Sequence, residues 1–494
     1  RRLRVQACNW QKKLVGVTSR RATFLTSLCP IPHILFVGYQ GVNDEKAMRA
    51  ARYYKFGILL LIGVALLIGV FGNGTIKALW KFTQEYPHAS FLVLLDINQQ
   101  ESQVPSYVLP PILRSVAGAP IASATDWQNN REDLLQEFSR FIYGQTPEEV
   151  ISVKTRVVES SASALRGKAT RQQVTLSFQG HEVTLLIYRP NNILKPVPAF
   201  LGLNFRGNHT VSTDPSIYLT ASWVPIDEEN GVFTHQATDA NRGQRARRYP
   251  IESIIDSGYA FVTAYYGDFY PDHIDGKAAS IQTLFAPSEG TSEWGAVGAW
   301  SWGMSRMLDY LAEDINIDAT KVIAIGHSRL GKAALWAAAQ DARFAAAISN
   351  NSGAVGAALS RRQFGETVKI ITALFPHWFT PKLNDYRDQV DRLPVDQHQL
   401  VALLAPRPVY VASASEDLWA DPKGEFLSAS QAEAVYRLFD KDANNLLTMP
   451  AAGEGIAGPI SYHLRPGKHD LLEFDWQRYL AFADCYVVME VACR

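Results

Sequence analysis

The turn at residues 326–332, Gly-His-Ser-Arg-Leu-Gly-Lys, constrains the fold of this chain more than any other segment. Residues 321–325 before it are apolar after Lys321 and largely β-branched, as in a buried strand, and residues 333–340 after it are rich in strong helix formers. A Ser between a strand and a helix, flanked by Gly, is typical of a nucleophile elbow, where the hydroxyl projects from the edge of a sheet. The second Gly stands one place later than in the general pattern, and Ser328 could instead cap the helix. We predict a nucleophile, because strand and helix lie on the correct sides.

The rest of the chain alternates between strand-like and helix-like patterns. Apolar runs of buried-strand length recur at residues 197–204, 259–266, 344–349 and 408–414. Apolar residues at helical spacing occur at residues 130–143 and 294–311. Residues 173–178 and 181–188 alternate, which predicts an antiparallel hairpin through Gln179 and Gly180. This order favours a doubly wound, mostly parallel sheet between helical layers, that is, an α/β-hydrolase fold in a three-layer sandwich.

The N-terminal part has a different character. Residues 1–47 are basic, begin without Met and show no sustained periodicity, so they form an uncertain leader, disordered or the result of a mis-assigned start. A basic stretch then precedes the uncharged run 56–72, which predicts a signal peptide or signal anchor over residues 48–76. A buried core helix is the alternative. We expect a connector over residues 77–95 and a globular α/β-hydrolase domain over residues 96–494.

Charge and cysteine usage bear on the compartment of the protein and on whether it binds nucleic acid or metal. The positive flank of the apolar run places the remainder outside the cytoplasm by the positive-inside rule, whether periplasmic, extracellular or membrane-anchored through residues 56–76. The formal net charge is zero, so nothing favours nucleic acid as a partner. No cysteine spacing resembles a metal site, although Cys485 and Cys493 could pair in an exported protein. No metal or cofactor is expected.

A Ser nucleophile needs a base that a third group orients, and in this fold the chain order is Ser, acid, His. The candidates for the base are His463 and His469. We favour His469, because it lies in a loop bounded by Pro and Gly, just before the last expected helix near residues 475–476.

The acid should follow a late strand. Asp417 lies three residues beyond the strand expected at 408–414, where a short side chain can reach an imidazole. Glu416 should point to the other side, and Asp421 is expected to cap the following segment. Asp396 precedes a helix and is interpreted as its cap.

Taken together, these residues resemble the glucuronoyl esterases of carbohydrate esterase family 15, in their bacterial style. The resemblance covers roughly residues 92–485 and includes the elbow with the family's displaced Gly. The further matching blocks, in one order along the chain, are residues 202–209, 300–303, 352–362, 365–367, 375–379, 393–398, 405–408, 416–422 and 465–469. So many ordered blocks are far more specific than the elbow alone.

The resemblance implies Ser328 as the nucleophile and His469 as the base. The family has two places for the acid. Fungal members carry a Glu in the place that is Asn351 here, which cannot hold a negative charge, whereas many bacterial members place the acid one strand later, at Asp417 here. The departure at Asn351 therefore strengthens the assignment of Asp417.

The resemblance also implies the groups that hold the substrate. Arg329 is similar to the family's oxyanion residue, although it could also form a surface salt bridge. Lys332 corresponds to the residue that donates to sugar hydroxyls, and Glu366 and Trp419 to the other contacts of the glucuronate. Without the resemblance, Trp419 would be interpreted as core and Glu366 as a solvated charge.

The function that follows is a serine esterase, a carboxylic ester hydrolase acting on esters of (4-O-methyl-)glucuronic acid. Its partner would be glucuronoxylan, with the ester linking the acid to lignin alcohols. Two alternatives stay open: an acetyl xylan esterase or another carboxylic-ester hydrolase of the same fold, and an inactive, membrane-tethered carbohydrate-binding protein.

Overall fold

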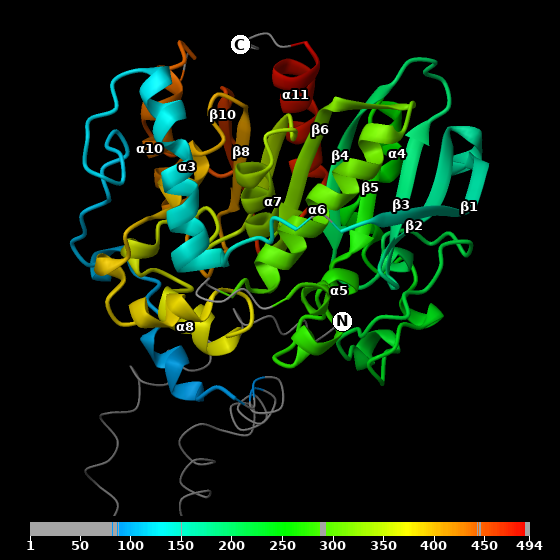
Figure 1. The fold of residues 1–494 in the computed structure, drawn as a ribbon, viewed down its shortest axis with the longest axis horizontal. Helices are drawn as coiled ribbons and strands as arrows, with labels where there is room; N and C mark the ends of the chain where they lie inside the picture. Colours follow the sequence, from blue (N-terminus) through cyan, green and yellow to red (C-terminus); the bar gives the residue numbers. More distant parts are fainter. Residues whose placement is uncertain are drawn as a thin grey trace, which may run out of the picture. The chain divides into compact units, whose positions relative to one another are not determined.

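The computed structural model describes residues 88–149, 151–286, 293–441 and 446–489, together with Phe82, Tyr86 and Ala443 (Figure 1). The chain divides into two compact units, residues 1–95 and 96–494, and the second contains all the strands and helices discussed below. The apolar run predicted as a signal or anchor, residues 48–76, lies outside the described residues.

A ten-stranded sheet organises the second unit, with the strand order β1-β2-β3-β5-β4-β6-β7-β8-β10-β9. The pairs from β5 through β4, β6, β7 and β8 to β10 are parallel, while β1, β2 and β3 at one edge and β9 at the other are antiparallel. The strands are β1 Val153–Ala164, β2 Ala169–Phe178, β3 His181–Pro190, β4 Val197–Asn204, β5 Ala260–Tyr265, β6 Ile317–His327, β7 Ala346–Asn350, β8 Val409–Ala414, β9 Gly455–Ile456 and β10 Ile460–Arg465.

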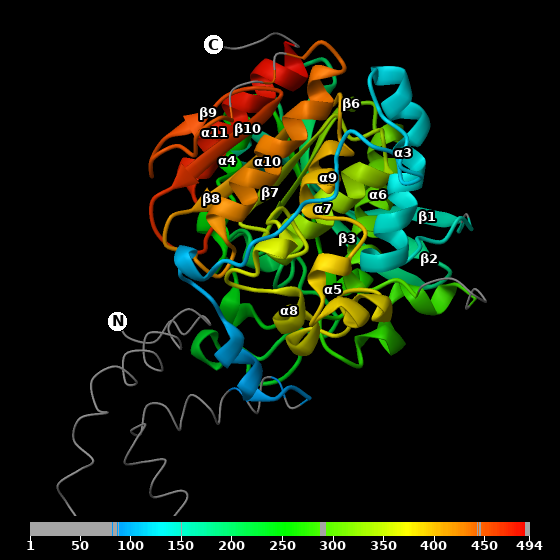
Figure 2. The ribbon, with the colours of Figure 1, turned by 90° about the vertical axis from the view of Figure 1, so that its left-hand side faces the viewer.

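Helices cover both faces of this sheet, as Figures 1 and 2 show. Alternate residues of β6 mark the two faces: Val322 and Ala324 join the core beneath α3, α6, α7, α9 and α10, whereas Ile323 and Ile325 join the core beneath α4 and α11. The helices are α3 Ala124–Phe138, α4 Ile251–Asp256, α5 Tyr266–Phe269, α6 Ala296–Glu313, α7 Arg329–Gln340, α8 Val368–Leu374, α9 Gln397–Ala402, α10 Pro422–Arg437 and α11 Glu473–Ala483. The predicted three-layer α/β-hydrolase sandwich is confirmed.

Most of the expected elements occur with small shifts at their ends. The hairpin of β2 and β3 turns through Gln179 and Gly180, both with positive φ, as the sequence predicts. Three strands escaped the sequence analysis, namely the two-residue β9 and the longer strands β1 and β10. β1 is largely exposed and polar, and β10, with the sequence Ile-Ser-Tyr-His-Leu-Arg, is fully buried although half of its residues are polar. Neither strand shows the apolar pattern on which the prediction relied.

No helix among the described residues is long and apolar enough to cross a membrane. Cys485 is disulfide-bonded. The predicted pairing with Cys493 falls on a residue outside the described part of the chain.

Candidate active site

Ser328 stands at a sharp corner between β6 and α7. Its backbone has φ 58° and ψ −131°, a region that a residue with a side chain seldom adopts, so the elbow is strained. The strand continues into the corner through a hydrogen bond from Ser328 N–H to the Asn350 carbonyl of 2.8 Å. The Ser328 side chain makes no capping hydrogen bond to the helix. The alternative role as a helix cap therefore has no support, and the hydroxyl is available for chemistry.

Close contacts surround both glycines of the motif, and they are closest at Gly326. A Cβ on Gly326 would lie 1.9 Å from the Leu330 carbonyl oxygen, and one on Gly331 would lie 3.1 Å from the Gly326 carbonyl oxygen and from Cβ of Ser352. Gly326 therefore lets the strand meet the first turn of α7, and Gly331 lets that turn pack on the neighbouring loop. This packing explains the displaced position of the second glycine.

Asp417 and His469 meet at the carboxyl ends of adjacent parallel strands. Asp417 follows β8 and His469 follows β10, and His469 Nδ1 lies 2.6 Å from Asp417 Oδ2. The Asp417 side chain is 1% exposed and the His469 side chain 23%. A carboxylate that accepts from Nδ1–H leaves Nε2 unprotonated and able to take a proton. The structure thus brings the predicted acid and base together.

The imidazole of His469 packs against the residue that precedes the nucleophile in the chain. Its ring centroid is 4.5 Å from that of His327, the residue that directly precedes Ser328. Burial, and then the neighbouring His469, hold the pKa of His327 well below its usual value, so this inner ring stays neutral. Among the contacts of the described residues, no hydrogen bond joins Ser328 Oγ to His469. Such catalytic hydrogen bonds are often long before substrate binds and shorten in the complex.

Arg329, the first residue of α7, is held in place by a buried carboxylate that the sequence analysis missed. Its guanidinium forms an ion pair with Asp272 and lies 4.5 Å from the Trp378 ring centroid and 5.3 Å from that of Phe375. Its side chain remains 27% exposed. A fixed, partly exposed guanidinium beside the nucleophile is the kind of preorganised charge that stabilises an oxyanion.

Asp272 collects three further donors. It accepts hydrogen bonds from Tyr266 Oη at 2.8 Å, from Trp378 Nε1 at 2.7 Å and from His377 Nε2 at 2.8 Å. Burial tends to raise the pKa of Asp272, but the Arg329 charge and these donors hold it well below its usual value. Asp272 is therefore a permanent anion that fixes Arg329. Asp272 carried no signal in the sequence, although its partners His377 and Trp378 lie in one of the matching blocks.

The three predicted sugar contacts also lie together. Lys332 Nζ is 3.3 Å from Glu366 Oε2, and Glu366 N–H donates to the Trp419 carbonyl at 2.8 Å. Lys332 is 2% exposed and also donates to the carbonyl oxygens of Ser352 and Ala354. An ammonium group has three protons, so Lys332 reaches a sugar hydroxyl only by exchanging one of these acceptors. The sugar contacts stay predictions.

Relatives of known type share this architecture. A family model described as glucuronyl esterase, fungi, matches residues 252–440. Carbohydrate esterase MZ0003 of an unknown prokaryotic organism is 45% identical over 399 residues, covering 78% of this chain and 91% of that relative. The structure of a promiscuous CE15 esterase from the marine bacterial metagenome matches with TM-score 0.74 and 44% identity over 78% of this chain and 99% of that one. The chain belongs to carbohydrate esterase family 15, the glucuronoyl esterases.

Bacterial and fungal members of family 15 both resemble the chain. The glucuronoyl esterase from Solibacter usitatus matches with TM-score 0.73 and 42% identity, over 78% of this chain and 99% of that one. The 4-O-methyl-glucuronoyl methylesterase of Schizophyllum commune is 26% identical over 66% of this chain and 72% of that relative. Asn351 stands at the position where fungal members of family 15 carry the acid, and its Nδ2 donates to Asp417 Oδ2 at 2.9 Å. Asn351 thus supports the acid, and its φ of 49° is one that Asn tolerates.

The rejected candidates have structural roles. Asp396 is the N-cap of α9, in a capping box, and pairs with Arg361, and Asp421 is the N-cap of α10. Glu416 is exposed. His463 is fully buried inside β10, with Nε2 2.8 Å from Asp475. The interpretation of Asp396 and Asp421 as caps is confirmed.

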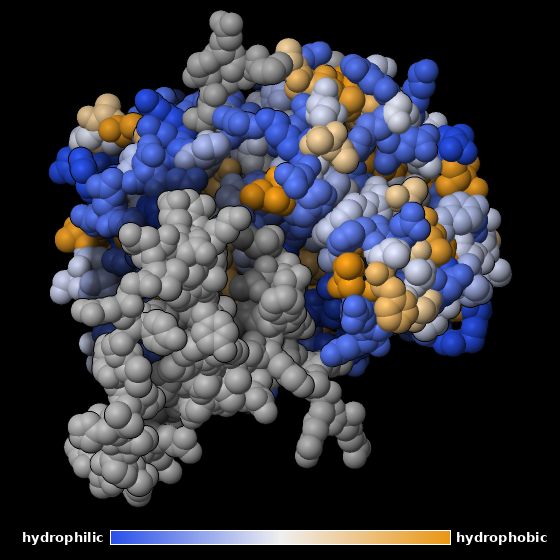
Figure 3. Space-filling model, turned by 90° about the horizontal axis from the view of Figure 1, so that it is seen from below, coloured by the Kyte–Doolittle hydropathy of each residue, from blue (hydrophilic) through white to orange (hydrophobic). Residues whose placement is uncertain are grey.

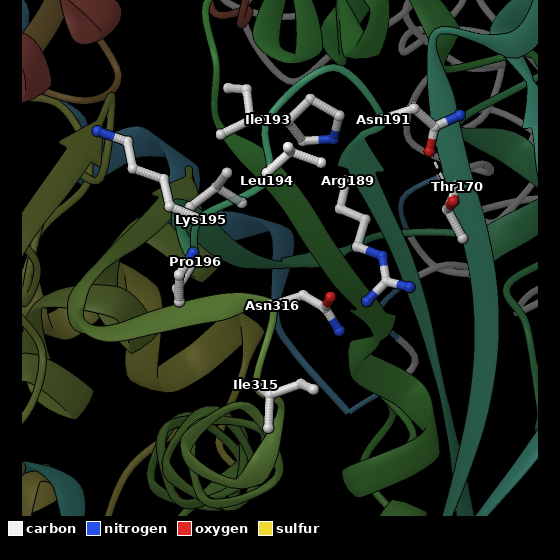
Figure 4. A pocket seen from close by; sticks show the side chains of 11 residues that line it. Thr170, Arg189, Asn191, Ile193, Leu194, Lys195, Pro196, Ile315 and Asn316 are labelled. Atoms are coloured by element: carbon white, nitrogen blue, oxygen red, sulfur yellow. Dashed lines mark hydrogen bonds between the residues drawn. The ribbon is translucent and has the colours of Figure 1, made fainter.

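A groove of about 190 Å³ opens at the other end of the sheet. Figure 4 shows its lining, which includes Arg189, Leu194, Ile315 and Asn316. These residues lie near the starts of β4 and β6, whereas Ser328 follows the end of β6, so the groove is separate from the catalytic edge. No group of three or more His, Cys, Asp or Glu in the described part of the chain could hold a metal ion.

Replacing Arg329 by Lys should lower kcat roughly 10²-fold with little change in KM, because a lone ammonium cannot keep the Asp272 contact and also face a developing oxyanion. The measurement is steady-state hydrolysis of a glucuronate ester. Arg343→Lys is the matched control, since Arg343 is a 47% exposed arginine paired with Asp309 and Asp341. Equal kcat values for the two variants would contradict the oxyanion role.

Proposed function

We propose that the protein is an exported serine esterase that hydrolyses esters of (4-O-methyl-)glucuronic acid in glucuronoxylan, cleaving ester links to lignin alcohols. The observation that carries the proposal is the hydrogen-bonded pair of Asp417 and His469, held at the same edge of the sheet as the strained Ser328. Relatives named 4-O-methyl-glucuronoyl methylesterase and glucuronoyl esterase support the choice of acyl group.

The mechanism uses only side chains of this chain. Ser328 Oγ attacks the uronate carbonyl while His469 Nε2 takes its proton, and Asp417 stabilises the imidazolium that forms. Arg329 faces the oxyanion of the tetrahedral intermediate. The imidazolium then protonates the leaving alcohol, and a water activated by His469 attacks the acyl-enzyme and releases the uronic acid.

The surroundings of the catalytic edge suit a hydroxylated substrate. Glu366 offers a carboxylate to sugar hydroxyls, and the partly exposed Trp419 lies against it. The parallel strands run toward the side of the sheet that carries α5 and α8, and the coloured surface seen from that side is mainly hydrophilic, with separate hydrophobic residues (Figure 3). A polysaccharide is compatible with such a surface.

Export is proposed on two features. A basic stretch precedes an uncharged run at residues 56–72, which fits a signal peptide or a signal anchor within residues 48–76. The disulfide of Cys485 fits an oxidising compartment. Fractionation of cells that express the full gene, followed by N-terminal sequencing of the mature protein, separates a cleaved signal from a retained anchor.

The substrate assignment is tested with Glu366→Gln, which keeps the shape and removes the charge. Losing a charge-assisted hydrogen bond to the sugar should lower kcat/KM for benzyl glucuronate by roughly 10- to 100-fold. Hydrolysis of 4-nitrophenyl acetate, which has no sugar hydroxyls, should change little in the same variant. Release of benzyl alcohol and of 4-nitrophenol is followed side by side.

A broader ester specificity is the second candidate, because one similar structure is that of a promiscuous family 15 esterase. Equal losses on both esters in Glu366→Gln, or faster turnover of acetyl xylan than of the glucuronate ester by the unmodified enzyme, would favour that candidate. No turnover of any ester and no labelling by a fluorophosphonate would favour an inactive carbohydrate-binding protein.

A further inference from the structure

The loop that carries His469 is short and irregular. Helix or sheet hydrogen bonds do not set its conformation, so other contacts must. It runs from Pro466 to Asp470 between β10 and α11, and Gly467 has φ 101°. A backbone of this kind has carbonyl groups that neither helix nor sheet satisfies. The partners of these carbonyls therefore decide where His469 points.

One guanidinium satisfies three of them. Arg465, the last residue of β10, donates through Nη1 to the Pro466 carbonyl at 2.9 Å. Its Nη2 donates to the carbonyls of Lys468 at 2.6 Å and Asp470 at 3.0 Å. Lys468 and Asp470 flank His469, so the guanidinium holds the backbone on both sides of the base. The Arg465 side chain is 3% exposed, which shields these bonds from water.

The guanidinium is itself anchored from behind. Arg465 Nε lies 3.1 Å from Oδ2 of Asp475, in a charge contact without hydrogen-bond geometry. Asp475, in the first turn of α11, also accepts from Leu472 N–H and from His463 Nε2, each at 2.8 Å. This anchor is fully buried, so the position of the guanidinium is tied to both β10 and α11.

The same loop is joined to the loop of the acid. Ser415 N–H donates to the Arg465 carbonyl and Glu416 N–H to the Gly467 carbonyl, both at 2.8 Å, and Gly467 N–H donates to Ser415 Oγ at 3.2 Å. Asp417 follows directly after Glu416. The shape that Arg465 imposes on residues 466–470 therefore fixes His469 relative to Asp417.

We propose that Arg465 is a positioning residue, whose guanidinium sets the path of the His469 loop and so aligns the imidazole with Asp417; this role rests on the proposed esterase function. Arg465 touches neither the substrate nor the reacting atoms. A lysine could not replace it, because one ammonium cannot reach three carbonyls lying in two directions and also contact Asp475.

The matched control is Arg407, a half-buried arginine that also donates to three backbone carbonyls. Its guanidinium donates to the carbonyls of Ala338 at 2.6 Å, Phe344 at 2.8 Å and Asp341 at 3.2 Å. Arg407 itself lies just before β8 begins, at the opposite end of that strand from Asp417. Arg407→Lys removes a comparable set of hydrogen bonds without touching the loops of the acid and the base.

The experiment compares Arg465→Lys with Arg407→Lys. In Arg465→Lys the displaced base should lower kcat roughly 10²-fold, with KM for benzyl glucuronate unchanged. Arg407→Lys should keep kcat within about twofold per folded molecule, because Arg407 lies away from the loops of the acid and the base. NMR of ¹⁵N-histidine-labelled protein gives a second readout. The proton between His469 Nδ1 and Asp417 should give a far-downfield resonance that persists in Arg407→Lys and is lost in Arg465→Lys.

The inference is overturned if Arg465→Lys keeps both kcat and the downfield resonance, or changes no more than Arg407→Lys. If Arg465→Lys does not fold, Asp475→Asn loosens the same anchor, and unchanged kcat and resonance there also overturn the inference. The resonance is read without turnover. An unmodified enzyme that hydrolyses no ester would thus count against the proposed function, while the resonance still decides the role of Arg465.

Discussion

Replacing Ser328 by Ala is expected to abolish ester hydrolysis, with kcat falling by roughly 10⁶-fold, as for a serine hydrolase that loses its nucleophile. No other group can take its place, because the elbow presents this one hydroxyl beside the Arg329 guanidinium and near the His469 ring. Substrate binding should survive, since the sugar contacts predicted at Lys332 and Glu366 are untouched. The measurement is glucuronic acid release, with binding of the ester followed by calorimetry.

Ser328→Gly is the companion variant. Glycine adopts positive φ without strain, so this change should remove the hydroxyl and also relieve the backbone at φ 58°. We expect an inactive protein with a raised Tm. Ser430→Ala is the control for activity, because it removes from α10 a hydroxyl that donates to the Leu446 carbonyl. If either Ser328 variant turned over the ester at the rate of the Ser430 control, Ser328 could not be the nucleophile.

Replacing Asp417 by Asn should cost roughly 10⁴-fold in kcat with intact geometry. The amide can donate to Nδ1 of His469, which then holds its proton on Nε2 and cannot accept one from Ser328. Asn351, the other side chain that contacts Asp417 Oδ2, at 2.9 Å, is itself neutral and cannot replace the charge. The measurement is kcat at neutral pH, on protein whose folding is checked by circular dichroism.

Glu416→Gln is the matched control for Asp417→Asn, since it removes an exposed carboxylate one position away. It should leave kcat within about twofold. A second test returns a charge to the other acid place: Asn351→Asp in the Asp417→Asn background should recover part of the activity. An Asp417→Asn enzyme as active as Glu416→Gln would rule out Asp417 as the acid.

The sequence was sufficient to predict the position of those site residues that follow strands with an apolar pattern. The elbow follows an apolar β6 and Asp417 an apolar β8, so their places at the sheet edge could be predicted from periodicity and chain order. The strand before His469 could not, because β10 buries Ser461, His463 and Arg465. These side chains are satisfied by tertiary partners, which no local pattern reveals.

Asp272 and the burial of Lys332 show where the sequence stops being informative. Asp272 has its role only because Tyr266, Arg329, His377 and Trp378 converge on it from separate segments. Lys332 stays a predicted sugar contact, and nothing in the sequence indicated that it would also donate to Ser352, Ala354 and Glu366. Both facts depend on loop conformations, which local propensity leaves undetermined.

The order of the strands has a consequence for biosynthesis. The predicted base comes from the loop after β10, and β10 is the last strand of the sheet along the chain. A nascent polypeptide that has emerged only as far as α10, which follows Asp417, therefore carries the nucleophile and the acid but no base. Products of this gene that end before His469 should therefore be unable to hydrolyse esters, because they lack the predicted base.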